Sequence, residues 1–179
     1  MAATRKEAFP AYWFKVELDF PSAMGVSAPP EGFRFRSCSG LKSESAVVDM
    51  EEGGFNTTTR KLIGKTKFPN IVLKHGFLGA DSVLWKVRQK FQQDLLPGSP
   101  APKLERGRKL PNRFSGKITA MGPNGATASF GFSNGWICKW EGPDLDATKN
   151  EVAIEAIEIA HEGLFMIPTP PPAGGGTKP

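Results

Sequence analysis

The alternation of apolar and polar residues predicts a chain built mostly from short β-strands. From Tyr12 to Phe20, apolar side chains occupy every second position and charged ones lie between them, as in a half-buried strand. A second alternating strand is predicted at residues 33–36, after a loop at residues 21–32 that is rich in Pro, Gly, Ser and Ala. Two further strands are predicted at residues 71–74 and 136–140.

Two hairpins are predicted from turn residues between stretches with strand character. The longer one spans residues 43–63 and reverses at Glu51-Glu52-Gly53-Gly54, where the glycines can supply positive φ. The other joins residues 117–121 to residues 126–132 through Pro123-Asn124-Gly125, in which Asn-Gly is a strong hairpin signal.

One helix is predicted at residues 80–96, capped by Asp81 and ended by Pro97-Gly98. Its apolar face carries Leu84, Val87, Phe91 and Leu95 with Val83 beside them, and its polar side carries Lys86, Arg88, Lys90 and Gln92. Residues 1–11 are interpreted as a loose arm, residues 97–111 as a loop and residues 168–179 as a disordered tail. About seven strands and one helix predict a single antiparallel β-barrel or sandwich domain over residues 1–167.

The stretch from Asn150 to Leu164 fits two structures. Its glutamates, at positions 151, 155, 158 and 162, have the spacing of an acidic stripe on a helix. Its β-branched residues form two alternating pairs whose phase slips by one residue, as in a strand with a β-bulge. The pattern by itself leaves both structures open.

Composition narrows the class of protein without identifying it. A chain of 179 residues with 39% hydrophobic residues suits one domain with a full core. The net charge of +5 permits a polyanionic partner, but the acidic and basic residues are interspersed. The sequence holds no apolar run of membrane-spanning length and no secretory signal, which predicts synthesis in a cytoplasm with Cys38 and Cys138 as buried free thiols.

Motifs for chemistry are incomplete. Gly64-Lys65-Thr66 resembles the end of a P-loop, but Phe68-Pro69 prevents the helix that must follow, and His161-Glu162 lacks the second histidine of a zinc protease. We therefore expect no cofactor, no metal and no enzymatic activity. The glutamates of residues 150–164 are interpreted as a solvated face or an interface row. A basic loop could hold phosphates but lacks aromatic platforms, and contains Lys103, Arg106, Arg108, Lys109 and Arg113.

Three stretches together resemble a known family. The first contains Cys38-Ser39-Gly40-Leu41-Lys42-Ser43-Glu44, the second runs from Lys61-Leu62-Ile63-Gly64 to His75-Gly76, and the third from Asn134-Gly135-Trp136 to His161-Glu162-Gly163-Leu164. In this order they resemble the tail tube proteins of contractile-tailed phages, including the inner tube proteins of extracellular contractile injection systems. Hcp of type VI secretion is a more distant relative.

The resemblance implies a β-barrel or sandwich with one flanking helix, in which residues 151–160 form a bulged strand. It also implies hexameric rings that stack into an inner tube, which a contracting sheath drives through a target envelope. The implied partners are further copies of the chain, the sheath protein, baseplate or spike and tube-cap proteins, and cargo in the lumen. The tube subunit inserts into no membrane itself, and its particle is either released or anchored to an envelope.

The hairpin at residues 43–63 exceeds what one small sandwich needs, so we expect it to project and to dock on the adjacent ring. The residues assigned to this contact are Glu51, Glu52, Gly53, Gly54 and Phe55. Three alternatives remain open on the sequence. They are a specialised ring subunit next to the spike, a β-barrel that binds nucleic acid or a small ligand, and a hydrolase whose triad is assembled in space.

Overall fold

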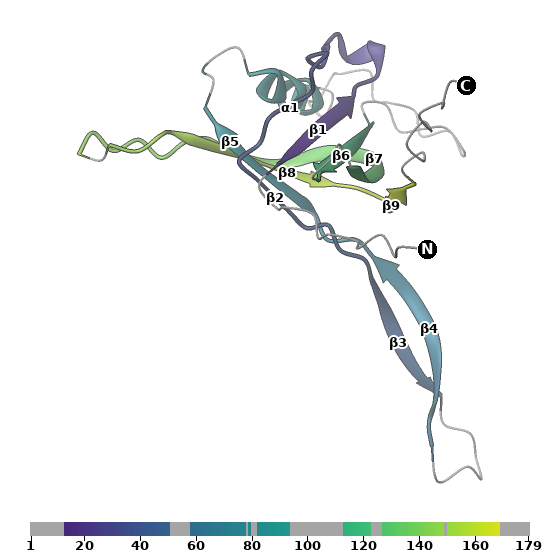
Figure 1. Ribbon diagram of the computed structural model, residues 1–179. Coiled ribbons are helices and arrows are strands. Elements are labelled where there is room, and N and C mark those ends of the chain that lie inside the picture. Colours follow the sequence, from purple (N-terminus) through teal and green to yellow (C-terminus); the bar gives the residue numbers. More distant parts are fainter. Residues whose placement is uncertain are drawn as a thin grey trace, which may run out of the picture.

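The computed structural model describes residues 13–50, 58–77, 79, 82–93, 113–122, 127–148 and 150–168. These residues form a mostly β structure with one α-helix, α1 (Val83–Gln93), and one short 3-10 helix, Ser22–Met24. The strands, shown in Figure 1, are β1 (Phe14–Asp19), β2 (Ser37–Ser39), β3 (Glu44–Met50), β4 (Arg60–Lys67), β5 (Ile71–Gly76), β6 (Phe114–Met121), β7 (Thr127–Glu141), β8 (Ile154–Ala160) and β9 (Gly163–Ile167).

Seven strands form one antiparallel sheet that folds over on itself as a sandwich. The order is β1-β6-β7-β8-β5-β2, and β9 also pairs with β7. The first part of β7 lies between β6 and β9, whereas its last residues pair with β8. The sheet therefore has two layers that share β7, and it does not close into a barrel. The sequence predicted a barrel or sandwich, and the sandwich is confirmed.

The sheet changes direction at Asn134 in the middle of β7. Asn134 has a φ of 53°, a left-handed conformation that asparagine tolerates better than most residues. Its carbonyl accepts a hydrogen bond of 2.8 Å from Arg113, and its side-chain amide donates to Glu162 at 2.9 Å. The sequence analysis divided this region into two strands, at residues 126–132 and 136–140. That division was wrong, because the chain bends here without leaving the sheet.

The core lies between the two layers and under α1. The alternation predicted for β1 is confirmed, since Val16 and Leu18 are buried. Leu84 and Val87 close the core from α1. Arg88, which we placed on the polar side of the helix, instead donates a hydrogen bond of 2.8 Å to the carbonyl of Ile137 on β7. Its guanidinium thereby ties the helix to the backbone of the sheet. Asp81, Leu95 and the predicted helix ends lie outside the described residues.

One predicted strand lies elsewhere in the structure, and one strand of the structure was not predicted. At residues 33–36 only Phe33 bridges β1, and the strand β2 begins at Ser37, because the chain here passes from one layer to the other. The strand β9 was not predicted. Its exposed side chains Phe165 and Met166 point to opposite faces, so the strand has no apolar–polar alternation.

The ambiguous stretch is a strand and not a helix. The strand β8 begins at Ile154, whereas the prediction began at residue 151, and Val152 is exposed before it. The predicted bulge is on the partner strand instead. The register between β7 and β8 shifts between Ile137 and Lys139, while β8 pairs with β5 without a shift. Glu155, Ile157 and Ile159 therefore all point into the core.

Candidate assembly interface

The strands β3 and β4 form a separate two-stranded hairpin that leaves the body of the protein. Figure 1 shows this hairpin, which we call the arm, extending well beyond the sandwich. Its register runs from Glu44 opposite Lys67 to Met50 opposite Arg60, with one irregularity between Ser45 and Val47. The predicted hairpin is confirmed, although β4 continues four residues past the predicted end at residue 63, until Phe68-Pro69.

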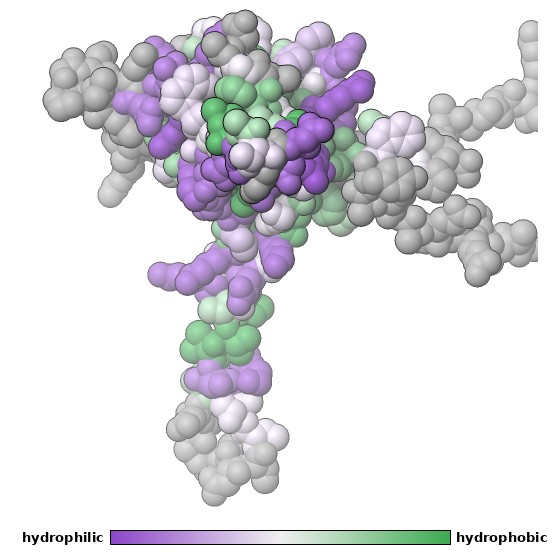
Figure 2. All heavy atoms as spheres, turned by 90° about the vertical axis from the view of Figure 1, so that its left-hand side faces the viewer, coloured by the Kyte–Doolittle hydropathy of each residue, from purple (hydrophilic) through white to green (hydrophobic). Residues whose placement is uncertain are grey.

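Apolar side chains on the arm are exposed to a degree that is unusual for a free protein. Figure 2 shows them as a band across the projecting arm, between two polar regions. Ile63 is 91% exposed, and the others are 45–64% exposed: Val47, Val48, Met50 and Leu62. A contiguous apolar patch of this kind marks a surface that another molecule covers. An isolated two-stranded hairpin is also marginally stable, so the arm itself gains from being covered.

Polar pairs hold the two strands of the arm in register. The ammonium of Lys61 lies 3.0 Å from Asp49, and the hydroxyls of Ser45 and Thr66 are 2.8 Å apart. Both pairs are exposed, so each contributes little to stability. They lie on either side of the Val47–Ile63 pair.

The predicted interface residues, Glu51 to Phe55, belong to the part of the arm that lies outside the described residues. The strands on either side are described, and they carry the apolar band that the sequence analysis did not single out. The available signal was two short apolar runs, Ala46-Val47-Val48 and Leu62-Ile63, on facing strands of a hairpin. Because neighbouring residues of a strand point to opposite faces, such runs expose apolar side chains on both faces.

The body also presents open sheet edges. Within the described residues, β2 pairs only with β5, β9 pairs only with β7, and β1 pairs with β6 apart from one bridge to Phe33. The edge strand β9 exposes Phe165 at 52% and Met166 at 66%. An apolar edge strand is a ready template for pairing with another chain.

A buried polar cluster lies beneath the helix and was missed by the sequence analysis. Glu155 is completely buried, whereas we expected the glutamates of this region to be solvated or in an interface. Its carboxylate accepts hydrogen bonds from Ser82 at 3.1 Å and from Trp140 at 3.1 Å. His75 Nε2 lies 2.7 Å from the same carboxylate, without the alignment of a hydrogen bond.

These residue types occur in catalytic triads, but their arrangement here differs from that of a triad. The Ser82 hydroxyl donates to the carboxylate and not to the imidazole, so it has no adjacent base. Ser82 is also buried, and its hydroxyl accepts the backbone N–H of Trp85 at 3.4 Å, as an N-cap does. The cluster therefore fastens the start of α1 to β5, β7 and β8.

The other residues considered for chemistry have structural contacts. Arg113, from the basic loop, stacks 5.5 Å from the ring centre of Trp136 and lies 3.7 Å from Glu162. The remaining members of that loop lie outside the described residues. Cys38 and Cys138 are free, as predicted, but both are half-buried and not fully buried. Burial raises the pKa of the Cys38 thiol to about 11. In the described part of the chain, no helix is long and apolar enough to cross a membrane.

Comparison with known proteins gives one family and a set of similar folds. The family model for the T4-like virus tail tube protein gp19 matches residues 10–165. A comparison with curated protein sequences gives no match.

Three solved structures share the fold. The cap of the anti-feeding prophage, a tube-terminating cap, is 18% identical with a TM-score of 0.69, covering 94% of this chain and 97% of the other. A chain in the 6-fold symmetrised baseplate of the same particle is 19% identical with a TM-score of 0.67, and the match covers 93% of this chain and 97% of the other. The third structure is the sheath–tube complex of PVC, an extracellular contractile injection system, in its extended state. A chain in it is 19% identical with a TM-score of 0.66, and the match covers 90% of this chain and 93% of the other.

Proposed function

The chain belongs to the T4-like virus tail tube protein family, and on this premise we propose that it is the tube subunit of a contractile injection system. Copies close into rings of six, the rings stack into an inner tube, and a sheath around the tube drives it through a target envelope. The subunit performs no catalytic step in this function. Its work is mechanical, and depends on rigid rings and strong contacts between them.

The observation that carries the proposal is the exposed apolar band on the projecting arm. A monomer would leave Ile63 in water, at a cost of about 1.5–3 kcal/mol, and its half-exposed neighbours at a smaller cost each. A ring repeats the arm in every subunit, so covering it stabilises the assembly many times over. A head-to-tail contact of this kind closes when the rotation between copies divides a full turn.

The open edges of the sheet support ring closure. The strands β1, β2 and β9 lie at edges of the sandwich, so a neighbouring copy can extend the sheet at each of them. The arm then remains available for the adjacent ring. We propose that its tip, Glu51 to Phe55, makes the contact between rings, as expected from its position at the end of a long hairpin.

The further partners follow from the same function. The proposed partners are the sheath protein along the outside of the tube and baseplate, spike and cap proteins at its ends. The similar folds include structures named for a cap, a baseplate and a sheath–tube complex. These names belong to those proteins, and they motivate the partners proposed for this one.

The first test is the mass of the purified protein in solution. Light scattering across a wide range of protein concentrations should give a species of six subunits or larger, growing as the concentration rises. A protein that stays monomeric at the highest concentration contradicts the proposal and favours a ligand-binding function for the single sandwich.

A further inference from the structure

Each face of the arm carries an apolar pair, Val47 with Ile63 on one face and Val48 with Leu62 on the other. One flat contact can cover only one of these two faces. Side chains alternate along β3, so Ser45, Val47 and Asp49 share one face with their partners Thr66, Ile63 and Lys61. Thr66 and Ile63 are three residues apart on β4, and the register irregularity between Ser45 and Val47 brings them to the same face. On this face the pair of Val47 and Ile63, which we call the arm knob, lies between the Ser45–Thr66 hydrogen bond and the Asp49–Lys61 ion pair. The knob contains Ile63, the most exposed apolar side chain in the described part of the arm.

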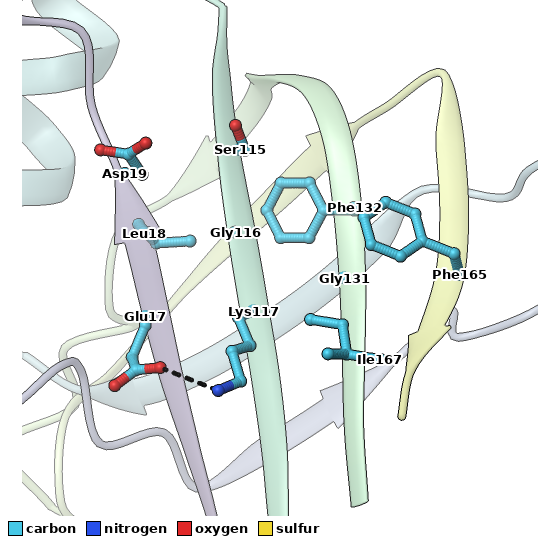
Figure 3. Close-up of a pocket in the computed structure, with 10 residues that line it drawn as sticks. All are labelled: Glu17, Leu18, Asp19, Ser115, Gly116, Lys117, Gly131, Phe132, Phe165 and Ile167. Atoms are coloured by element: carbon cyan, nitrogen blue, oxygen red, sulfur yellow. Dashed lines mark ion pairs between the residues drawn. The ribbon is translucent and has the colours of Figure 1, made fainter. Parts of the chain in front are cut away.

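The body carries a hollow whose chemistry matches the knob. It has a volume of about 300 Å³ and is shown in Figure 3. We call it the β1–β9 hollow, because its lining comes from β1, β6, β7 and β9: Glu17, Leu18, Asp19, Ser115, Gly116, Lys117, Gly131, Phe132, Phe165 and Ile167. The hollow is open to solvent, and Phe165 in its lining is half-exposed.

Glycine makes the hollow possible. A Cβ atom at Gly131 would lie 2.5 Å from the ring of Phe165, so only glycine lets this ring lie across β7. Phe165 and Ile167 then form an apolar wall beside a strip of sheet that has no side chain. Apolar surface in a concave site is the usual seat for an apolar side chain from a partner.

The rim of the hollow is charged. Glu17 lies 3.9 Å from Lys117 and 2.8 Å from Lys15. Asp19, at the other end of the rim, has no ion-pair partner in the part of the chain that the structure describes. The strand β4 carries four cations, Arg60, Lys61, Lys65 and Lys67, and no acidic residue. The apolar knob and the polar pairs on either side of it therefore match the apolar floor and the polar rim of the hollow in chemical character.

We propose that the β1–β9 hollow of one copy receives the arm knob of another copy, with Ile63 against Phe165 and Ile167 and with a cation of β4 near Asp19. The occupant comes from a second copy because the arm of each chain points away from its own body, as Figure 1 shows. This inference rests on the proposed tube function. It adds the site on the neighbour that one face of the arm occupies.

Disulfide trapping tests the contact between the two positions. Ile63→Cys and Phe165→Cys variants, each in a background where both natural cysteines are replaced by serine, are mixed, assembled and oxidised. Ser115→Cys replaces Phe165→Cys in a parallel experiment, in case loss of the aromatic ring disturbs β9. The control partner is Leu145→Cys, which replaces another exposed apolar side chain, 85% exposed and not part of the hollow.

The expected result is a disulfide joining position 63 of one chain to position 165 or 115 of another, with a yield at least tenfold above that with position 145. Mass spectrometry of the linked peptides identifies the pair. Tubes seen by electron microscopy, combined with a yield equal to that of the control, overturn this inference and leave the tube function standing. Disulfides only between two copies of position 63 also overturn it, in favour of contact between arms. A protein that forms no rings or tubes overturns both proposals.

Discussion

His75 Nε2 lies 2.7 Å from the carboxylate of Glu155, at a point where no solvent reaches the carboxylate. The contact joins β5 to β8, and the hydrogen bonds from Ser82 and Trp140 bring α1 and β7 to the same two oxygens. A buried carboxylate is tolerated only when its oxygens are satisfied in this way. The cluster thus fixes the helix on the sandwich, which is the rigid part of the proposed tube wall.

Replacing Glu155 with Ala should destabilise the protein severely. The change leaves the Ser82 hydroxyl and the Trp140 indole N–H without their acceptor, at about 1–3 kcal/mol for each unsatisfied group, so a total loss of about 2 kcal/mol or more is expected. Urea unfolding followed by tryptophan fluorescence measures it. The control is Glu151→Ala, an exposed glutamate four residues earlier, which should change the free energy of unfolding by less than about 0.5 kcal/mol. Equal losses in the two variants would show that the cluster does not stabilise the fold.

The glycine of β6 gives a second prediction, on packing. A Cβ at Gly116 would overlap the ring of Phe132 and approach Leu18 Cδ2 at 2.9 Å. Gly116→Ala should therefore lower the free energy of unfolding by about 1–3 kcal/mol through overpacking. Gly76→Ala is the matched control on β5, because its Cβ would meet nothing closer than 3.9 Å. A Gly116→Ala protein as stable as the control would contradict the packing described here.

Cys38 gives a prediction for pH. Burial raises the pKa of its thiol from 9.0 to about 11, so the folded chain keeps a proton that the unfolded chain loses above pH 9. The stability from this group is complete below pH 9 and should fall as the pH rises towards 11. Alkylation of folded Cys38, in a Cys138→Ser background, should also be slow at pH 8, since only roughly one thiol in a thousand is ionised. Alkylation at the rate of an unfolded thiol would mean that Cys38 is accessible to solvent and not shifted.

These results show which parts of the molecule the sequence could predict. The strand β1 was predictable because its alternation matches a surface buried on one side, and Val16 and Leu18 are buried as the pattern requires. The strand β9 was not, because an exposed edge strand with apolar side chains on both faces has no such alternation. The helix-like spacing of the glutamates was accidental, since Glu155 and Glu158 project from opposite faces of β8.

Of the candidate sites, the arm could be predicted from the sequence, whereas the buried cluster and the hollow could not. The arm could be predicted from its length and turn residues, because both signals are local. The buried cluster could not, because the partners of Glu155 lie 73 residues away at Ser82 and 15 residues away at Trp140, on other elements. The hollow depends on a glycine of β7 meeting an aromatic ring of β9, which only the sheet register reveals.

The tip of the arm gives a prediction about stacking. Phe55→Asp should leave folding and ring formation intact but prevent rings from stacking, because a charge would have to be buried where an aromatic ring is proposed to bind. Electron microscopy of the variant separates the outcomes. The control is Thr59→Ser, an exposed residue of the same hairpin, which should form tubes as long as those of the wild type. Normal tubes with Phe55→Asp would show that the tip does not join rings, and loss of rings would place Phe55 in the core.

Electron microscopy of the purified wild-type protein tests the central claim most directly. The account predicts rings with six-fold symmetry that stack into hollow tubes, each ring built from one copy of the sandwich repeated around the axis, with the arms covered by neighbouring copies. Averaged end-on views give the symmetry without further assumptions. Particles that remain single sandwiches with free arms, under conditions where the protein is folded and concentrated, would contradict it.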